Sequence, residues 1–581
     1  MSVADDLPGD PFDHRLALAA GGPLADFNAA GVLESADVHV AQRITALGGE
    51  TDESVGLAVA LTVRALRAGS VCVDLSTVAA ECGAPELPWP QSAPWLAAVR
   101  ASRLLGDPPV LRLYDDRLLY LDRYWREETQ VCTDLLALSA PGSAVRAPTL
   151  QRLFPAGYEE QRAAAEIVLS QAVTVLTGGP GTGKTTTVAR LLALLTERAE
   201  GVRIAMAAPT GKAAARLTEA VAAEVAKLDP GDRECLAGLQ AVTLHRLLGS
   251  RPDSSVRFRH HRGNRLPHDV IVVDETSMVS LTMMARLLEA VRPEARLILV
   301  GDPDQLASVE AGAVLADLVD GLSDRDDRRV AALHSSHRFG KSIGALADAI
   351  RLGEADRAID VLRAGGEHIE WIDDEDPTDR LRALLVPHAL ALREAAVLGA
   401  DADALAALDR HRLLCAHRHG PSGVERWNRQ VHRWLTEETG LPVWSQWYAG
   451  RPLLVTANDY GLHVYNGDTG VVVARPDGLR AVISGAAEPV DFATSRLSDV
   501  ETMFAMTIHK SQGSQADEVT VLLPPQDSRL LTRELLYTAV TRAKAKVRMV
   551  GSEAAFRAAV ERRAVRASGL RQRLRSEIGP E

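Results

Sequence analysis

A glycine-rich run that ends in lysine and threonine is the clearest sign of chemistry in this sequence. Residues 178–185 read GGPGTGKT, between an apolar run and a helical pattern, and match G-x-x-x-x-G-K-[S/T]. The glycines let backbone N–H groups turn toward phosphate oxygens, and the following helix N-terminus adds partial positive charge. We expect Lys184 to reach the β- and γ-phosphates of ATP and Thr185 to bind Mg²⁺. The residues expected to bind the nucleotide here are Gly178, Gly179, Pro180, Gly181, Thr182, Gly183, Lys184, Thr185 and Thr186.

Two carboxylates supply the second half of such a site. Residues 270–275 read VIVVDE, so a short apolar strand would deliver Asp274 and Glu275 at its carboxyl end, where ligands bind in open α/β sheets. We expect Asp274 to hold Mg²⁺ and Glu275 to orient and polarise the attacking water. An Asp-Glu pair alone is a weak signal. Its place 90 residues after Lys184, followed by another apolar run that ends in Gly301-Asp302, favours the functional interpretation.

Hydrolysis also needs cations that meet the charge developing on the γ-phosphate. Arg338, in the triplet His-Arg-Phe, and Arg542, in Thr-Arg-Ala, are the candidates. Taken alone, each arginine is more typical of a solvated surface, so their assignment depends on the resemblance described below.

The elements that must position these residues form two α/β blocks. From about residue 150, apolar runs at 172–177, 202–207, 270–273 and 297–300 alternate with helical patterns such as 185–199, which predicts a parallel sheet covered on both faces. A second block begins near 331. It is interrupted at about 440–500 by a β-rich stretch with turn signals, which predicts a small inserted barrel. Residues 1–145 carry helical apolar stretches instead.

Composition and charge narrow the function classes. The 581 residues are 46% hydrophobic and 24% charged, which is typical of a globular chain of three or four domains. No apolar stretch approaches the ~20 residues of a membrane span, so we expect no membrane association. The five cysteines form no CxxC pair, which argues against a zinc knuckle. The first 150 residues have a net charge of −9 and the rest −3, so DNA contact requires a local groove, and the acidic front suits a protein partner.

Taken together, the motifs resemble superfamily 1 helicases, and within them the RecD family. In order they are Gln161; 178–185; APTGKAA at 208–214; TLH at 243–245; DETSM at 274–278; GDPDQL at 301–306; HRF at 337–339; MTIHKSQGS at 506–514; and YTAVTRA at 537–543. They span about two-thirds of the chain. The run LASVEAG at 306–312, NDY at 458–460 and YNGDTG at 465–470 carry the resemblance to RecD. Three of only seven lysines (184, 212 and 510) fall inside these motifs.

The resemblance implies two RecA-like P-loop motor domains with parallel sheets, an SH3-like β insertion and a mainly helical N-terminal domain. We expect the N-terminal, partner-docking domain at 1–145 and the first motor at 146–330. The second motor is expected at 331–440 and 500–581, with the insertion at 441–499.

The resemblance also assigns site residues. Gln161 would read the adenine, Gln305 would sense the γ-phosphate, and Arg338 and Arg542 would complete the site across the cleft between the motors. Thr210, His245, Thr507 and His509 would lie where the motors meet single-stranded DNA. One departure is Gln515, where the family often has an acidic residue, which leaves the hydrogen bonding at that position open.

For function, the resemblance implies an ATP-dependent 5′-to-3′ DNA helicase subunit of a heterotrimeric RecBCD helicase–nuclease that processes double-strand ends for recombinational repair. Its partners would be DNA and RecB-like and RecC-like subunits, and its location cytoplasmic, with nucleoid association while on DNA. The main alternative is a stand-alone RecD2-type helicase, which the short front domain disfavours. A nuclease is disfavoured because no lysine follows an acid by two positions, so nuclease activity is expected from a partner. A binding module that uses ATP as a switch is the remaining alternative.

Two further features could contact DNA. Residues 250–268 contain Arg251, Arg257, Arg259, Arg262 and Arg265 against one acid, so phosphate contact and a solvated basic loop are both open. The tryptophans Trp427, Trp434, Trp444 and Trp447 could stack on bases, although core packing is favoured.

Overall fold

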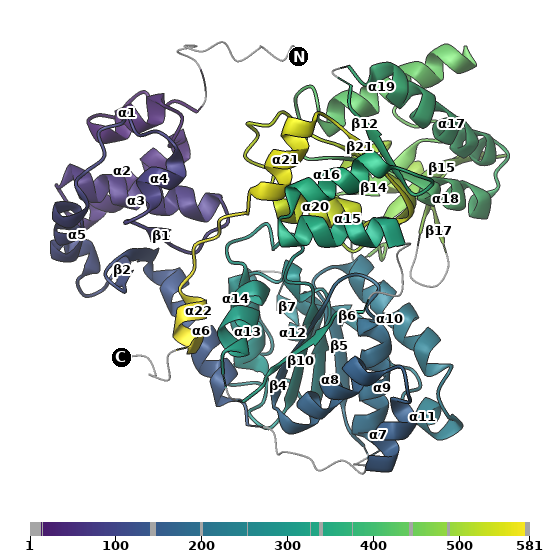
Figure 1. The fold of residues 1–581 in the computed structure, drawn as a ribbon, viewed down its shortest axis with the longest axis horizontal. Helices are drawn as coiled ribbons and strands as arrows, with labels where there is room; N and C mark the ends of the chain where they lie inside the picture. The colour runs from purple at the N-terminus through teal and green to yellow at the C-terminus, as the bar shows by residue number, and fades with distance from the viewer. Residues whose placement is uncertain are drawn as a thin grey trace.

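The computed structural model describes residues 13, 15–139, 147–197, 201–251, 254–325, 327–335, 341–374, 376–440, 445–459, 461–484 and 489–575. Within these residues, two parallel sheets lie in separate α/β parts, and a smaller helical part lies beside them (Figure 1). This confirms the predicted fold class of two motor domains with a mainly helical front. Among the described residues, no helix is long and apolar enough to cross a membrane.

The N-terminal part is built from short helices around an apolar centre. Its helices are α1 (Pro23–Ala29), α2 (Ser35–Gly48), α3 (Glu53–Arg67), α4 (Val78–Cys82) and α5 (Ser92–Ala101). An antiparallel sheet of β1 (Val73–Asp74), β3 (Leu118–Leu121) and β2 (Leu111–Tyr114) closes one side. Helix α3 is central because every residue from 55 to 62 is buried.

The first motor is a sheet of six parallel strands in the order β11-β4-β10-β9-β5-β6. The strands are β4 (Val173–Gly178), β5 (Ile204–Ala208), β6 (Ala241–Thr243), β9 (Val270–Val273), β10 (Arg296–Gly301) and β11 (Val330–Leu333). Helices α8 (Glu159–Ser170), α9 (Lys184–Thr196) and α10 (Gly211–Val225) cover one face. Helices α13 (Leu281–Ala290) and α14 (Val314–Ser323) cover the other. Burial on both faces explains the continuous apolar runs.

The second motor repeats this design with five parallel strands in the order β12-β21-β20-β13-β19. They are β12 (Ile369–Ile372), β13 (His411–Cys415), β19 (Ala505–Thr507), β20 (Ala516–Leu522) and β21 (Ala543–Val550). The helices are α15 (Lys341–Leu352), α16 (Ala355–Ala364), α17 (Thr378–Val397), α18 (Asp401–Arg410), α19 (Val424–Thr439), α20 (Arg533–Val540) and α21 (Glu553–Glu561).

A five-stranded antiparallel sheet interrupts the second motor between α19 and β19. Its order is β17-β16-β15-β14-β18, with bounds β14 (Pro452–Val455), β15 (Thr469–Arg475), β16 (Gly478–Ile483), β17 (Val490–Ala493) and β18 (Val500–Thr502). The turn at Pro476-Asp477 joins β15 to β16 because Arg475 pairs with Gly478. The inserted β unit is therefore present, and its SH3-like character stays a prediction.

Two expected boundaries differ from the structure. Strand β11 pairs with β4, so the first sheet extends past residue 330, because the apolar Ala331 and Leu333 are buried at its edge. Helix α22 (Leu570–Arg575) packs on α14 of the first motor instead of on the second, to which we assigned residues 500–581. The reason is that Leu570 and Leu574 are buried in the core of the first motor.

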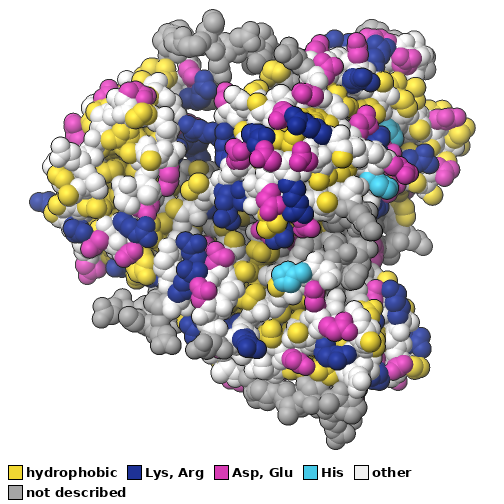
Figure 2. All heavy atoms as spheres, viewed as in Figure 1, with side chains coloured by type: hydrophobic (Ala, Val, Ile, Leu, Met, Phe, Trp, Pro, Cys, Tyr) yellow, Lys and Arg dark blue, Asp and Glu magenta, His cyan; other side chains and the backbone are white. Residues whose placement is uncertain are grey.

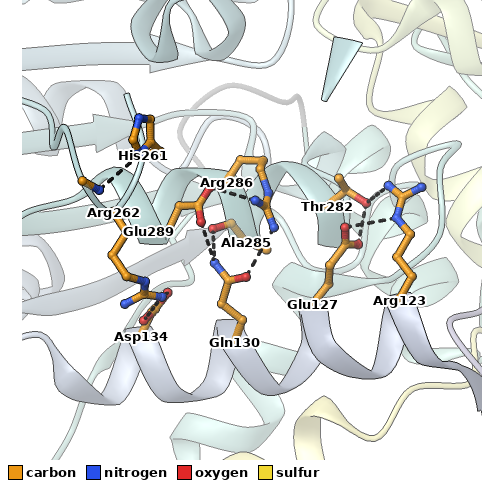
Figure 3. A network of polar contacts seen from close by, with 11 residues as sticks. Arg123, Glu127, Gln130, Asp134, His261, Arg262, Thr282, Ala285, Arg286 and Glu289 are labelled. Atoms are coloured by element: carbon orange, nitrogen blue, oxygen red, sulfur yellow. Dashed lines mark hydrogen bonds and ion pairs between the residues drawn. The ribbon is translucent and has the colours of Figure 1, made fainter. Parts of the chain in front are cut away.

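Helix α6 (Asp122–Ala137) ties the N-terminal part to the first motor along α13. Figure 3 shows the polar contacts between the two helices. The Thr282 hydroxyl donates to the Glu127 carboxylate at 2.7 Å, and the Gln130 amide donates to the Ala285 carbonyl at 3.0 Å. The N-terminal part is therefore joined to the first motor by a helix that packs against it, and not by a flexible linker alone.

Candidate ATP and DNA site

The predicted phosphate loop joins β4 to α9. Lys184 is the first residue of α9, and the preceding Gly183 has φ of 83°, a left-handed conformation that favours glycine. The Lys184 ammonium donates to the carbonyls of Gly178 at 2.5 Å and Gly179 at 2.9 Å. The loop therefore curls around the lysine at the N-terminus of a helix, which is the geometry that binds phosphate.

The two predicted carboxylates lie at the end of β9, beside this loop. The backbone N–H of Glu275 donates to the Asp274 carboxylate at 2.8 Å. Burial and, to a lesser degree, the neighbouring Glu275 charge together raise the pKa of Asp274 to about 6, against the opposing charge of Lys184. A bound cation would stabilise the charged form of such a buried carboxylate, and carboxylate oxygens are ligands that Mg²⁺ prefers.

A cleft of about 870 Å³ brings most of the predicted residues together. Gln161 lines it on one side and Arg542, from the second motor, on another. Arg338 lies outside the described residues. The predicted residues that line the cleft are Gln161, Pro180, Gly181, Gly183, Lys184, Thr185, Thr186, Asp274, Glu275, Gln305 and Arg542. The volume and the polar lining suit a nucleotide.

Residues of both motors meet at the end of β10. The Gln305 amide donates to the Asp302 carboxylate at 3.0 Å, and the Arg542 guanidinium donates to the Gln305 side-chain oxygen at 3.1 Å. From α20, the Tyr537 hydroxyl donates to Asp302 at 3.1 Å. Burial raises the pKa of Asp302 and lowers that of Arg542. A buried cation of the second motor is thus held at the nucleotide cleft of the first.

Arg216 is a cleft residue that the sequence analysis missed. It lies on α10, lines the cleft, and donates to the Gly513 carbonyl and, at 3.4 Å, to the Gln515 side-chain oxygen. Gln515 therefore accepts from an arginine of the other motor, a contact that an acidic residue could also make. The available signal was the position of Arg216 four residues after Lys212, one turn along the same helix.

The four predicted DNA contacts follow strands of the two sheets. Thr210 comes after β5, His245 after β6, and Thr507 and His509 at the end of β19. The Thr210 hydroxyl accepts the Ala213 N–H at 3.2 Å and so caps α10. His245 is exposed and packs against the ring of the buried Phe258, with 5.8 Å between centroids. Their DNA-binding role stays a prediction.

The basic stretch 250–268 is divided in its roles. A hairpin of β7 (Ser250–Arg251) and β8 (Ser254–Phe258) opens it. Arg262 forms an ion pair of 2.7 Å with Asp134 on α6 (Figure 3), and Arg265 donates to the Val291 carbonyl at 2.5 Å. These two arginines therefore hold neighbouring elements, whereas Arg257 and Arg259 are exposed.

The tryptophans lie mainly in packed positions. Trp427 and Trp434 are each 3% exposed in the core of the second motor, which favours packing over base stacking. Trp447 packs against the inserted sheet below the guanidinium of Arg451. Trp444 lies outside the described residues.

Family models match at residues 29–118 (RecBCD enzyme subunit RecD, N-terminal domain), 161–311 (AAA domain) and 502–550 (UvrD-like helicase C-terminal domain). The RecBCD enzyme subunit RecD of Mycobacterium tuberculosis is 72% identical over 97% of this chain and 99% of its own length. The chain belongs to the RecD family. The family assigned from the motifs is confirmed, and with it nucleotide binding by the motor.

Other proteins resemble this RecD family member at lower sequence identity. The RecD subunit of Haemophilus influenzae is 34% identical over 72% of this chain and 73% of its own length. The ATP-dependent RecD2 DNA helicase of Deinococcus radiodurans is 31% identical over 72% of this chain and 52% of its own. A solved Bacteroides Pif1 helicase covers 67% of this chain and 91% of its own at 17% identity and a TM-score of 0.39, which is too distant to add to the assignment.

Proposed function

We propose that this RecD-family chain is an ATP-dependent 5′-to-3′ DNA helicase motor and a subunit of a heterotrimeric helicase–nuclease that processes double-strand DNA ends for recombinational repair. The observation that carries the proposal is the hydrogen bond between Arg542 of the second motor and Gln305 of the first, at a cleft that also holds Lys184 and Glu275. Hydrolysis at such a site depends on the distance between the motors, which is how a translocase couples ATP to movement.

RecB-like and RecC-like partners follow from the relatives. Identity of 72% to a protein named RecBCD subunit RecD, against 31% to a RecD2 helicase, supports a subunit over a stand-alone enzyme. The match of residues 29–118 to the RecD N-terminal domain supports the assignment of residues 1–145 as the docking domain. A subunit that works on chromosomal ends would lie in the cytoplasm, associated with the nucleoid while on DNA.

The site residues expected from the sequence have the following roles in the proposed reaction. Thr185 and Asp274 would hold Mg²⁺, which neutralises phosphate charge when bound, and the buried carboxylate and the hydroxyl in one cleft fit that ion. Lys184 binds the β- and γ-phosphates, Glu275 orients the water, and Gln161 reads the adenine. Gln305, Arg338 and Arg542 stabilise the charge that develops on the γ-phosphate.

DNA coupling would use Thr210 and His245 on the first motor and Thr507 and His509 on the second. Each pair follows the carboxyl ends of parallel strands, so each sheet presents its pair at one edge. As ATP draws the motors together and hydrolysis releases them, the two pairs would move along a single strand in turn.

The test is Lys184→Gln in the chain assembled with its partner subunits. Loss of the lysine should abolish ATP hydrolysis by this subunit and leave assembly and nuclease activity in place, because the clamp on the phosphates acts in the transition state. Lys227→Gln is the matched control, since Lys227 is exposed and forms an ion pair of 2.7 Å with Glu224, three residues earlier. Wild-type hydrolysis by the Lys184 variant contradicts the proposal. Robust unwinding by the lone chain, with no partner retained, favours the stand-alone helicase.

A further inference from the structure

The C-terminal segment, residues 562–575, connects the second motor to the first motor and to the N-terminal part (Figure 1). Its start is fixed on the second motor: the Arg533 N–H donates to the Arg562 carbonyl at 2.8 Å, and the Ala564 N–H donates to the Glu534 carboxylate at 2.9 Å. Figure 2 shows Lys and Arg side chains gathered along the border between the N-terminal part and the motors, where this segment runs.

The other end of the C-terminal segment is fixed at a buried carboxylate. Glu128, on α6, is fully buried and accepts hydrogen bonds from the Ser568 hydroxyl at 2.7 Å and the Gly569 N–H at 3.1 Å. Arg573 forms an ion pair with Glu128 at 3.3 Å, and its guanidinium lies 4.0 Å from the centre of the Tyr114 ring. The two ends of the segment are therefore held by different parts of the molecule.

Between these ends, Arg566 binds the loop of residues 305–312. Its Nη1 donates to the Ser308 carbonyl at 2.5 Å and to the Glu310 carbonyl at 3.2 Å. The guanidinium lies over Gly69, where a Cβ would come within 2.8 Å of it, so the absence of a side chain there makes room for the arginine. Arg566 thus helps to hold the far end of a loop whose first residue, Gln305, is a predicted γ-phosphate sensor.

The second motor holds the near end of the same loop. The Gln512 amide donates to the Leu306 carbonyl at 2.8 Å, and the Leu306 N–H donates to the Thr538 hydroxyl at 2.9 Å. Predicted DNA contacts lie close by: burial lowers the pKa of His509, and the nearby Arg566 cation lowers it further. The loop therefore contacts the nucleotide cleft through Gln305 and the segment that carries His509 through Gln512, three residues further along the chain.

We infer that Arg566 is a positioning residue for ATP hydrolysis, which fixes the 305–312 loop so that Gln305 meets Arg542 when DNA is bound. The inference rests on the proposed function of this same cleft. The Nη1 group of a planar guanidinium carries two N–H bonds in fixed directions, one for each carbonyl, whereas the shorter lysine side chain ends in a freely rotating ammonium that would not fix the same directions. Without Arg566, the Ser308 and Glu310 carbonyls lose this donor, while the loop keeps its backbone hydrogen bonds to Ser277, Leu281 and Gly69. A displacement of about 1 Å at a reacting centre costs up to about 10²-fold in rate, so a small shift of the loop is enough to slow hydrolysis.

The experiment compares Arg566→Gln, Arg566→Lys and the control Arg563→Gln in the full chain assembled with its partners. Arg563 lies on the same segment, is exposed, and forms a weak 4.0 Å ion pair with Glu534. The activity of the Lys184→Gln complex is subtracted, so that only hydrolysis by this subunit is counted. The readouts are kcat with and without saturating single-stranded DNA, the KM for ATP, and DNA affinity at several salt concentrations.

We expect Arg566→Gln to lower the DNA-stimulated kcat about ten-fold or more. The KM for ATP and the DNA affinity should stay within about two-fold of wild type, because neither ground-state contact is removed. Arg566→Lys should recover part of the loss, and Arg563→Gln should behave as wild type. If Arg566→Gln does not fold, the test is the lysine variant, which keeps the charge. Its DNA-stimulated kcat should still be lower than that of wild type.

Three outcomes overturn the inference. The first is a wild-type DNA-stimulated kcat in both Arg566 variants. The second is a loss of DNA affinity with a salt slope reduced by about one, which would make Arg566 a phosphate contact instead. The third is a wild-type complex with no more ATPase than Lys184→Gln, which overturns the proposed function and the inference with it.

Discussion

The guanidinium of Arg542, on the second motor, donates a hydrogen bond of 3.1 Å to the side-chain oxygen of Gln305, on the first. Both side chains are buried at the nucleotide cleft, at 4% and 7% exposure. A hydrogen bond between buried groups of two domains exists only when the domains are close, so this pair reports closure of the motors. It also places a cation within the same cleft as the predicted phosphate lysine, Lys184.

The first prediction concerns this arginine. Arg542→Gln should lower the DNA-stimulated kcat of this subunit by about 10³-fold, because an arginine supplied to the γ-phosphate stabilises charge that develops only in the transition state. The KM for ATP should change far less. Single-turnover hydrolysis with radiolabelled ATP measures both quantities in the assembled complex.

Lys544→Gln is the matched control for Arg542. Lys544 lies two residues further on, is exposed, and pairs with Asp517 at 3.3 Å. The Lys544→Gln variant should hydrolyse ATP at the wild-type rate. A loss at Arg542 that appears mainly as a higher KM would show that the arginine binds the ground state, which contradicts the assigned role.

The sequence was sufficient for the parts of the site that are local in the chain. A strand, a glycine turn and a helix that starts at Lys184 are adjacent residues, and the apolar run before Asp274 predicts its place at a strand end. Contacts between remote segments could not be predicted. Arg262 has the character of a DNA contact until its partner Asp134, 128 residues earlier, is found beside it. Apolar residues at 570 and 574 define a helix face but not the surface that covers it, which is α14.

The second prediction separates the two roles within the basic stretch. Arg259→Glu should weaken single-strand binding and lower the slope of log K against log salt, because Arg259 is exposed and follows Phe258, against whose ring the predicted DNA contact His245 packs. Arg262→Glu should leave that slope unchanged, since the Arg262 charge is already paired with Asp134 at 2.7 Å. Fluorescence anisotropy at several salt concentrations gives the slopes. Equal slopes for wild type and Arg259→Glu would rule out phosphate contact by this residue.

The third prediction concerns the buried carboxylate of α6. Glu128→Gln should lower the first thermal unfolding transition by about 6 °C or more, because it breaks the ion pair of a fully buried carboxylate with the largely buried Arg573 cation, at about 3 kcal/mol or more. Differential scanning calorimetry measures the transition. In the folded protein, the Glu128 carboxylate accepts hydrogen bonds from Tyr120, Ser568, Gly569 and Arg573.

The control for Glu128 is Arg571→Gln. Arg571 lies on the same terminal helix, is exposed, and pairs with Asp320 at 3.5 Å, so its loss should shift the transition by no more than about 2 °C. Glu128→Gln with an unchanged transition would mean that this junction does not limit the stability of the first motor.

The last prediction is a pH dependence at Asp317 of α14. Burial raises the pKa of Asp317 to about 7, a Ser568 hydrogen bond lowers it, and of the charged neighbours Glu128 and Asp320 raise it while Arg571 lowers it. Because an unfolded aspartate titrates near 3.9, the folded state binds this proton more tightly, so deprotonation reduces stability as the pH rises from about 4 to about 7. Asp317→Asn removes that loss. The difference in transition temperature, variant minus wild type, should therefore grow between pH 5 and pH 7 and then level off. Asp320→Asn, at an exposed position of the same helix, should give a flat difference, and a flat difference for Asp317→Asn would show that its carboxyl titrates as in the unfolded chain.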